Sequence, residues 1–274
     1  MFLRRPAPLC VAFLTLAILA EGLRPAGAQS LGDVIRSSMS AGVPGTAVAP
    51  SSPPRFANAD ANAGAAGGVP GLFGSREFRS DSLKGLPQWT RVLQVMAREQ
   101  PAFDACVQNA ARCVTPTLRN WRRIMTQATG LDRKAQIKAV NDFFNRWPYK
   151  EDTALYGRSE YWATPSEFMA RSGDCEDYAI AKYFALRQLG FSQDEMRIVI
   201  LMDQIRGIGH AVLAIYDEGE TVILDSLSNL IVSDQRYKHY LPQYSMNETT
   251  RWAHVGGFDW RTKMPYQGLA ARSN

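Results

Sequence analysis

The sequence contains few of the residues that most often carry out chemistry, since only four cysteines and three histidines occur among 274 residues. The net charge is only +5, and no cluster of lysine or arginine with interleaved aromatic residues is present, which argues against a nucleic-acid partner. The largely apolar run at residues 9–20 spans 12 residues, whereas a membrane-spanning helix needs roughly 18 or more. A cysteine or histidine of any active site must therefore come from a short list of candidates.

The N-terminus has the pattern of an export signal. Arg4 and Arg5 precede the apolar run, and the small residues Ala26, Gly27 and Ala28 follow it, as at a signal-peptidase site. We therefore predict a cleavable signal peptide over residues 1–28. Cys10 lies inside the apolar run and not after a cleavage site, so a lipid anchor is not predicted.

Composition divides the rest of the chain. Residues 29–80 are rich in alanine, glycine, serine and proline and contain too little apolar surface to offset the entropy of ordering, so a disordered linker is predicted. The periodic patterns of a folded domain follow in residues 81–262. We expect residues 263–274 to form a flexible tail.

Apolar residues at helical spacing begin the predicted domain. They predict helices near residues 86–96, 118–128 and 137–147, the last ended by Pro148. A loop-like passage follows, with one short helical turn expected at residues 166–170. Trp162, in this passage, is either a wall of an active cleft or a buried structural residue.

A fourth helix is predicted to begin at Cys175. Asp174 is a good N-cap, Glu176 and Asp177 suit the first turn, and Gly190 is a stop signal. Cys175 therefore lies in the first turn of a helix.

Three strands are predicted after this helix, at residues 196–202, 210–216 and 221–225. The last two form a hairpin through residues 217–220. If Tyr216 faces Thr221, then Val212 faces Asp225, and His210 shares the face of Val212 because side chains alternate along a strand. His210 and Asp225 are then diagonal neighbours, close enough for an imidazole to contact a carboxylate.

Three cysteines remain after signal cleavage, and an odd number in an oxidising compartment suggests one pair and one free thiol. Cys106 and Cys113 would close an eight-residue loop, which stabilises by about 2.5 kcal/mol in the chain-entropy estimate. The alternative is two unpaired structural cysteines. Pairing leaves Cys175 as the reactive thiol.

Cys175, His210 and Asp225 together have the composition of a catalytic triad. The thiolate is the nucleophile, His210 would act as base and then acid, and Asp225 would hold the tautomer of His210. Taken singly, a cysteine at a helix start is more often buried structure, and a histidine opening a strand more often a satisfied polar residue. The hairpin register favours catalysis. His239 lies in a tyrosine-rich run expected to be exposed, and neither it nor His254 has a carboxylate placed by so simple an argument.

The sequence resembles the bacterial transglutaminase-like cysteine proteinases, and within them the periplasmic LapG type, over about residues 80–255. The cysteine motif with its flanking acids is specific, whereas the histidine and aspartate motifs are weak alone. The matching segments are YWATPSEF (161–168), GDCEDYAIAKY (173–183), HAVL (210–213) and LD (224–225).

The resemblance implies an α+β, papain-like or transglutaminase-like fold, in which N-terminal helices and a central helix pack on an antiparallel sheet. It also implies a Cys175, His210 and Asp225 triad, and limited proteolysis of a large surface adhesin near its N-terminus, which would release the adhesin and disperse a biofilm. Such proteins are periplasmic and calcium-dependent. They are inhibited by the periplasmic domain of an inner-membrane receptor for cyclic di-GMP.

Asp174, Glu176 and Asp177 are the candidate calcium ligands. Three carboxylates close together suit a hard cation, although acids at a helix start also complement the helix dipole without one. The residues alone favour the dipole explanation, and the resemblance favours calcium. Three carboxylates would raise the pKa of the Cys175 thiol, and a cation could restore its thiolate character.

The same residues fit two other functions. One is acyl transfer to an amine by a transglutaminase reaction, because the acyl-enzyme step is the same. Another is a binding module without catalysis. For a peptidase, the backbone amide of Cys175 and a donor near Trp162 are candidates for the oxyanion site.

Overall fold

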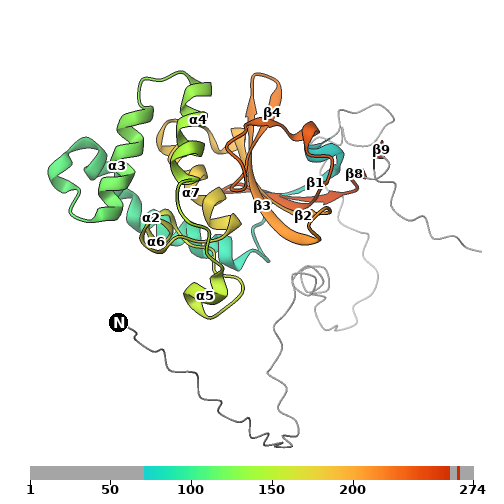
Figure 1. Ribbon diagram of the computed structural model, residues 1–274, viewed down its shortest axis with the longest axis horizontal. Helices are drawn as coiled ribbons and strands as arrows, with labels where there is room; N and C mark the ends of the chain where they lie inside the picture. The colour runs from blue at the N-terminus through green and yellow to red at the C-terminus, as the bar shows by residue number, and fades with distance from the viewer. Residues whose placement is uncertain (1–70, 260–263, 266–274) are drawn as a thin grey trace, which may run out of the picture. The chain divides into compact units, whose positions relative to one another are not determined.

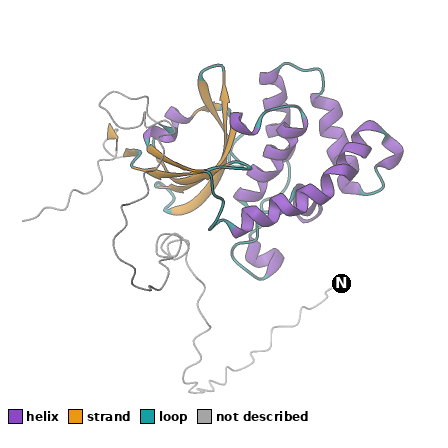
Figure 2. Ribbon diagram, turned by 180° about the vertical axis from the view of Figure 1, so that it is seen from behind, coloured by secondary structure: helices purple, strands orange, loops and turns teal. Residues whose placement is uncertain are grey.

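The computed structural model describes residues 71–259 and 264–265, in which helices and strands form two separate layers (Figure 1). Figure 2 shows the helices gathered on one side and the strands on the other. Most helices precede most strands along the chain. The predicted α+β fold, with N-terminal helices and a central helix packed on an antiparallel sheet, is confirmed.

The three predicted N-terminal helices are present. Pro87 and Pro116 open the first two, at positions where a missing N–H leaves no hydrogen bond broken. The first helix is longer than predicted and continues through Pro101. The helices are α2 (Pro87–Gln108), α3 (Pro116–Ala128) and α4 (Arg133–Phe144).

Two short helices lead from α4 to the helix that begins at Cys175. They are α5 (Asp152–Tyr156) and α6 (Pro165–Arg171), followed by α7 (Cys175–Gln188). Thr164 caps α6 by accepting the N–H of Glu167, whose side chain in turn accepts the N–H of Thr164. Gly190 follows α7 with φ +98°, a conformation that favours glycine.

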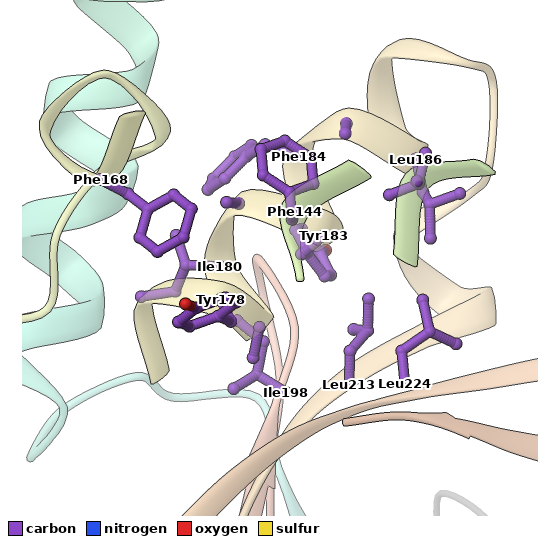
Figure 3. Packing of buried hydrophobic residues seen from close by; sticks show 14 of the residues in the cluster. Phe144, Phe168, Tyr178, Ile180, Tyr183, Phe184, Leu186, Ile198, Leu213 and Leu224 are labelled. Carbon is purple, nitrogen blue, oxygen red and sulfur yellow. The ribbon is translucent and has the colours of Figure 1, made fainter. Parts of the chain in front are cut away.

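Helix α7 is the central element of the domain. It is buried on nearly all sides, because it packs against α4 and α6 in one layer and against the strands β2 (Met196–Asp203) and β3 (Ile208–Asp217) in the other. Figure 3 shows its side chains Ile180, Tyr183 and Leu186 among residues of the helical layer and the sheet. The predicted stripe of one apolar face underestimates this burial.

Seven strands form one antiparallel sheet in the order β1-β7-β6-β2-β3-β4-β5. The predicted strands correspond to β2, β3 and β4, whereas β6 and β7 were not predicted. A separate pair, β8 (Phe258–Asp259) and β9 (Met264–Pro265), follows. The sheet strands are β1 (Arg76–Ser80), β2 (Met196–Asp203), β3 (Ile208–Asp217), β4 (Glu220–Leu224), β5 (Val232–Ser233), β6 (Tyr240–Met246) and β7 (Arg251–Val255).

Residues 71–80, which were predicted to belong to the linker, form ordered structure in the domain. Leu72 and Phe73 form the 3-10 turn η1 (Leu72–Gly74), are fully buried, and cover the face of the sheet that α7 does not. Strand β1 then pairs with β7. The composition of residues 29–80 concealed this segment because its two core residues stand beside glycines. Residues 29–70 lie outside the described residues.

Three other predictions concern residues outside the described ones: the signal peptide at 1–28, most of the linker, and nearly all of the tail at 263–274. In the part of the chain that the structure describes, no helix is long and apolar enough to cross a membrane.

The predicted disulfide between Cys106 and Cys113 is present. It closes the turn between α2 and α3, which contains the 3-10 turn η2 (Ala110–Arg112). Both cysteines are buried, and Cys175 is the free cysteine of the described residues.

Candidate active site

Cys175 is the first residue of α7 and is partly exposed, with Asp174 at the N-cap position, as predicted. The preceding chain is held in place because the N–H of Lys150 donates to the Gly173 carbonyl at 2.9 Å. A Cβ at residue 173 would lie 1.9 Å from the Asp177 carboxylate, so only glycine allows this close approach. The loop and the helix together fix the position of the thiol.

His210 and Asp225 lie together in the way that the hairpin register predicted. Tyr216 pairs with Thr221, and a two-residue turn at Glu218 and Gly219 joins β3 to β4. His210 Nε2 lies 2.9 Å from Asp225 Oδ1, and both side chains are buried. Because Asp225 binds Nε2, the Nδ1 atom of His210 is the ring nitrogen left for proton exchange.

The Asp225 carboxylate has two further donors. The Tyr240 hydroxyl donates to Oδ2 at 2.7 Å, and the Leu227 N–H donates to Oδ1 at 2.9 Å. Burial by itself raises the pKa of Asp225, but the hydrogen bonds and charge of His210, with these two donors, bring the pKa below its ordinary value. Asp225 is therefore held as a carboxylate beside the imidazole.

The position of Tyr240 shows that one prediction was wrong. The tyrosine-rich run around His239 was expected to be exposed, but Tyr240 opens β6 and is buried against the His210 ring, 5.7 Å between ring centres. The sequence did not indicate a strand here, because Pro242 and Gln243 interrupt the pattern of apolar residues. The third histidine, His254, lies between Ser75 and Ser245 and bonds to both hydroxyls.

The Cys175 thiol lies against the backbone of β3, beside the residue that follows His210. A hydrogen bond from the backbone of Ala211, the residue after His210, lowers the pKa of the Cys175 thiol. Burial has the largest effect in the opposite direction, and the charges of Glu176 and Asp174 add to it, so that the pKa lies well above its ordinary value. The thiol donates to Glu176 Oε2 at 3.1 Å. Without a counter-charge, burial and the neighbouring acids therefore hold Cys175 in its protonated form.

Four acids gather at the start of α7 in two overlapping groups that share Asp174. Donor atoms of Asp174, Cys175 and Glu176 lie within 4.8 Å of one another, and so do those of Asp152, Asp174 and Asp177. Asp152 comes from α5 and was not predicted. It stands 22 positions before Asp174, and only the folded chain brings the two together. One oxygen each of Asp152 and Asp174 is buried without a hydrogen-bond partner.

The electrostatics of these acids fit a hard cation. Burial, followed by the charges of its neighbours, raises the pKa of Asp174 to about 10, and burial and Asp177 raise that of Glu176 to about 7. The pKa values of Asp152 and Asp177 are raised as well, again mainly by burial. Carboxylate oxygens with free lone pairs are the ligands that Ca²⁺ takes in proteins.

Of the two alternatives for Trp162, a cleft wall or a buried structural residue, the structure supports the second. Its side chain is buried in the main core, and its carbonyl accepts a hydrogen bond from Arg91 at 3.0 Å. Asp177 accepts the N–H of Ala163 at 2.6 Å, which ties this passage to the first turn of α7. Tyr149, half exposed, stacks on Tyr178 next to the same turn.

A cysteine at the start of a central helix, next to a strand with a buried histidine–aspartate pair on an α+β domain, is the arrangement of papain-like and transglutaminase-like cysteine peptidases. The model of the family described as bacterial transglutaminase-like cysteine proteinase matches residues 98–259, which is more than half of the chain. The chain belongs to this family and is a transglutaminase-like cysteine protease.

Solved structures of LapG from Legionella pneumophila are similar to this chain. One is 32% identical and covers 55% of this chain and 85% of that chain, with a TM-score of 0.48. A calcium-bound LapG is 34% identical and covers 54% of this chain and 85% of that chain, also with a TM-score of 0.48. No match was found among curated proteins.

Proposed function

We propose that the protein is an endopeptidase in which Cys175 is the nucleophile, His210 the general base and acid, and Asp225 the residue that orients His210. The observation that carries this assignment is the buried contact of 2.9 Å between His210 and Asp225, formed next to the residue whose backbone bonds to the Cys175 thiol.

The proposed reaction has two halves. His210 takes the thiol proton, and the sulfur attacks the peptide carbonyl carbon. The C–N bond then breaks as His210 returns the proton to the leaving amine, which leaves a thioester on Cys175. Water attacks the thioester and gives a proton to His210, the C–S bond breaks, and that proton restores the thiol. The backbone N–H of Cys175 is the candidate donor to the oxyanion.

We further propose that Asp152, Asp174, Glu176 and Asp177 hold a calcium ion. The support is the buried carboxylate cluster with its unpartnered oxygens and raised pKa values. When bound, calcium would offset the negative charge beside the thiol and lower the pKa of Cys175. Activity would then depend on calcium although the proposed reaction uses only side chains of the chain itself.

The proposed substrate is the N-terminal region of a large surface adhesin, and its cleavage would release the adhesin and disperse a biofilm. The support is the resemblance of the cysteine motif to the LapG type, within a family that the chain belongs to. On the same basis we propose that the protein works in the periplasm. The periplasmic domain of an inner-membrane cyclic di-GMP receptor is the proposed inhibitor.

The test uses the N-terminal part of any giant adhesin encoded near this protein, incubated in calcium with the wild-type chain or with Cys175→Ala. One discrete cut by the wild type, and none by Cys175→Ala, is expected. Cleavage that persists in Cys175→Ala would remove the nucleophile from the proposal. Incorporation of a labelled amine without any peptide cleavage would assign acyl transfer in place of hydrolysis.

The calcium proposal is tested separately. Excess chelator should abolish cleavage, and Asp174→Ala or Glu176→Ala should reproduce this loss. Asp152→Asn should raise the calcium concentration needed for half-maximal activity. Asp142→Asn is the matched control, because Asp142 pairs with Lys138 on α4 and stands apart from the cluster. Full activity in excess chelator would rule calcium out.

A further inference from the structure

Lys182 is a buried lysine in the middle of α7, with no exposed surface. A lysine is almost never fully buried without a paired charge, yet within the described residues Lys182 forms no ion pair. Its ammonium donates to the backbone carbonyl of Asp225 at 3.1 Å and lies 5.9 Å from the centre of the Tyr178 ring. The side chain therefore crosses the core to contact the residue that holds His210.

Asn145 contacts the same carbonyl from another helix. It stands at the C-cap of α4, and its Nδ2 donates to the Asp225 carbonyl at 2.9 Å. The same nitrogen lies 3.1 Å from the Ser228 carbonyl and 2.9 Å from Asn229 Oδ1. Two donors from two helices thus converge on one backbone atom, at the point where β4 ends and the chain turns.

The energetics indicate that Lys182 serves more than packing. Burial lowers the pKa of Lys182 to about 7, a direct sign of how unfavourable the charged form is in this position, although the charge of Asp225 opposes the shift. An apolar side chain of similar volume in such a place is often neutral or stabilising. A fold that needed only volume here would be expected to use methionine or leucine.

We propose that Lys182 and Asn145 are positioning residues that fix the backbone of Asp225, and through its carboxylate the orientation of His210. This inference rests on the proposed function, because both residues are assigned a role in supporting the proposed triad. The chain of contacts is continuous: Lys182 and Asn145 bind the carbonyl of Asp225, and the side chain of Asp225 binds Nε2 of His210. Neither residue is proposed to touch substrate.

The first experiment measures alkylation of Cys175 by iodoacetamide in calcium across a range of pH. Loss of the outer contacts of a catalytic group commonly reduces activity by about 10- to 100-fold, and we expect a decrease of that size at neutral pH for Lys182→Met and Asn145→Ala. Lys182→Gln keeps an N–H donor and should retain more reactivity than Lys182→Met. Lys138→Met, on the exposed side of α4, is the matched control and should react like the wild type.

The second experiment observes His210 directly. Only three histidines occur in the sequence, so ¹⁵N-labelled imidazole signals are few, and His239→Gln and His254→Gln assign them by elimination. The Nε2 proton of His210 should give a low-field signal from its hydrogen bond to Asp225. In Lys182→Met this signal should shift or broaden. A residue that contributed only packing would change the unfolding midpoint and leave the signal in place.

The outcomes separate this inference from the proposed function. Cleavage of the adhesin fragment by Cys175→Ala contradicts the function itself. If Cys175 is essential, then wild-type alkylation rates, or an unchanged His210 signal, in folded Lys182→Met and Asn145→Ala contradict the positioning roles. Folding is checked by urea unfolding, and Asn145→Ala with Lys182→Gln decides the matter if Lys182→Met does not fold.

Discussion

Asp225 is constrained at both its side chain and its backbone. The carboxylate accepts hydrogen bonds from His210, Tyr240 and the Leu227 N–H, while the carbonyl accepts from Lys182 and Asn145. A carboxylate so fully bonded has little freedom to rotate. The imidazole it holds therefore keeps one tautomer, with the proton on Nε2 and Nδ1 free to act as a base.

A change of this carboxylate to an amide tests that role. In Asp225→Asn, the side chain can present its NH₂ group to Nε2, which favours the opposite tautomer of His210. We expect the rate constant kcat for cleavage to fall by about 10²- to 10⁴-fold with a much smaller change in KM. Steady-state kinetics on the adhesin fragment measure both. A variant with wild-type kcat would show that the tautomer is set by another group.

A second prediction concerns His254 and pH. Burial, with a smaller contribution from Arg197, lowers the pKa of His254 to about 4 from its usual 6.5, while Glu77 acts in the opposite direction. The unfolded chain therefore binds more protons than the folded one between those values. Stability present above pH 6.5 should be lost as the pH falls towards 4, by about 3 kcal/mol from this residue. Urea unfolding from pH 7 to pH 4 measures the loss.

The control is His254→Gln, in which the group no longer titrates. Its stability should fall less steeply between pH 6.5 and pH 4 than that of the wild type. His239→Gln provides a histidine substitution away from Ser75 and Ser245. Parallel pH profiles for the wild type and His254→Gln would contradict the assignment.

The sequence predicted a contact between two residues only where a short connection fixes how their elements pair. His210 and Asp225 were predictable because a two-residue turn fixes which residues of a hairpin face each other. Asp152, Lys182 and Tyr240 were not, because each contacts its partner in the site across two separate elements by tertiary packing. A buried lysine in particular carries the sequence signal of a surface residue.

Among the elements, helix α7 was predicted but its full burial was not, and the short segment before β1 was not predicted at all. Helix α7 was recognised by its cap and its stop glycine, yet its burial on nearly all sides did not follow from one apolar stripe. The segment of Leu72 and Phe73 was missed because two apolar residues are too few to form a period. Their burial depends on the sheet face that they cover, which forms from strands far along the chain.

This segment gives a prediction with an internal control. Phe73 is fully buried and Phe78, in the adjoining strand β1, is 59% exposed. Phe73→Ala should lower the free energy of unfolding by about 3–5 kcal/mol, as for other buried phenylalanines. Phe78→Ala should change it by no more than about 0.5 kcal/mol. Urea unfolding measures both, and equal effects would show that the segment does not belong to the cooperative core.

For the whole molecule, the proposed cation should couple activity to stability. A ligand that binds only the folded state stabilises by about 2.7 kcal/mol at 100 times its dissociation constant. We therefore expect calcium to raise the melting temperature Tm relative to excess chelator. Asp152→Asn and Asp174→Ala should reduce this increase, and Asp142→Asn should not. A Tm that does not respond to calcium in the wild type would separate any effect on activity from binding to the folded domain.

At this scale the layers of the fold were predictable and the domain boundary was not. Helical periods followed by apolar runs of strand length indicate an α+β domain whatever the loops contain. The boundary depends on which short segment returns to pair with a distant strand, as β1 does with β7.

The order of the strands also has a consequence for behaviour in concentrated solution. Strands β1 and β5 form the two edges of the sheet, where unpaired backbone groups could recruit a strand from another copy. One edge carries Arg76, Glu77 and Arg79 within five residues, and the other is only two residues long. Charge at one edge and brevity at the other both oppose sheet extension, so the domain is protected against aggregation through its own strands.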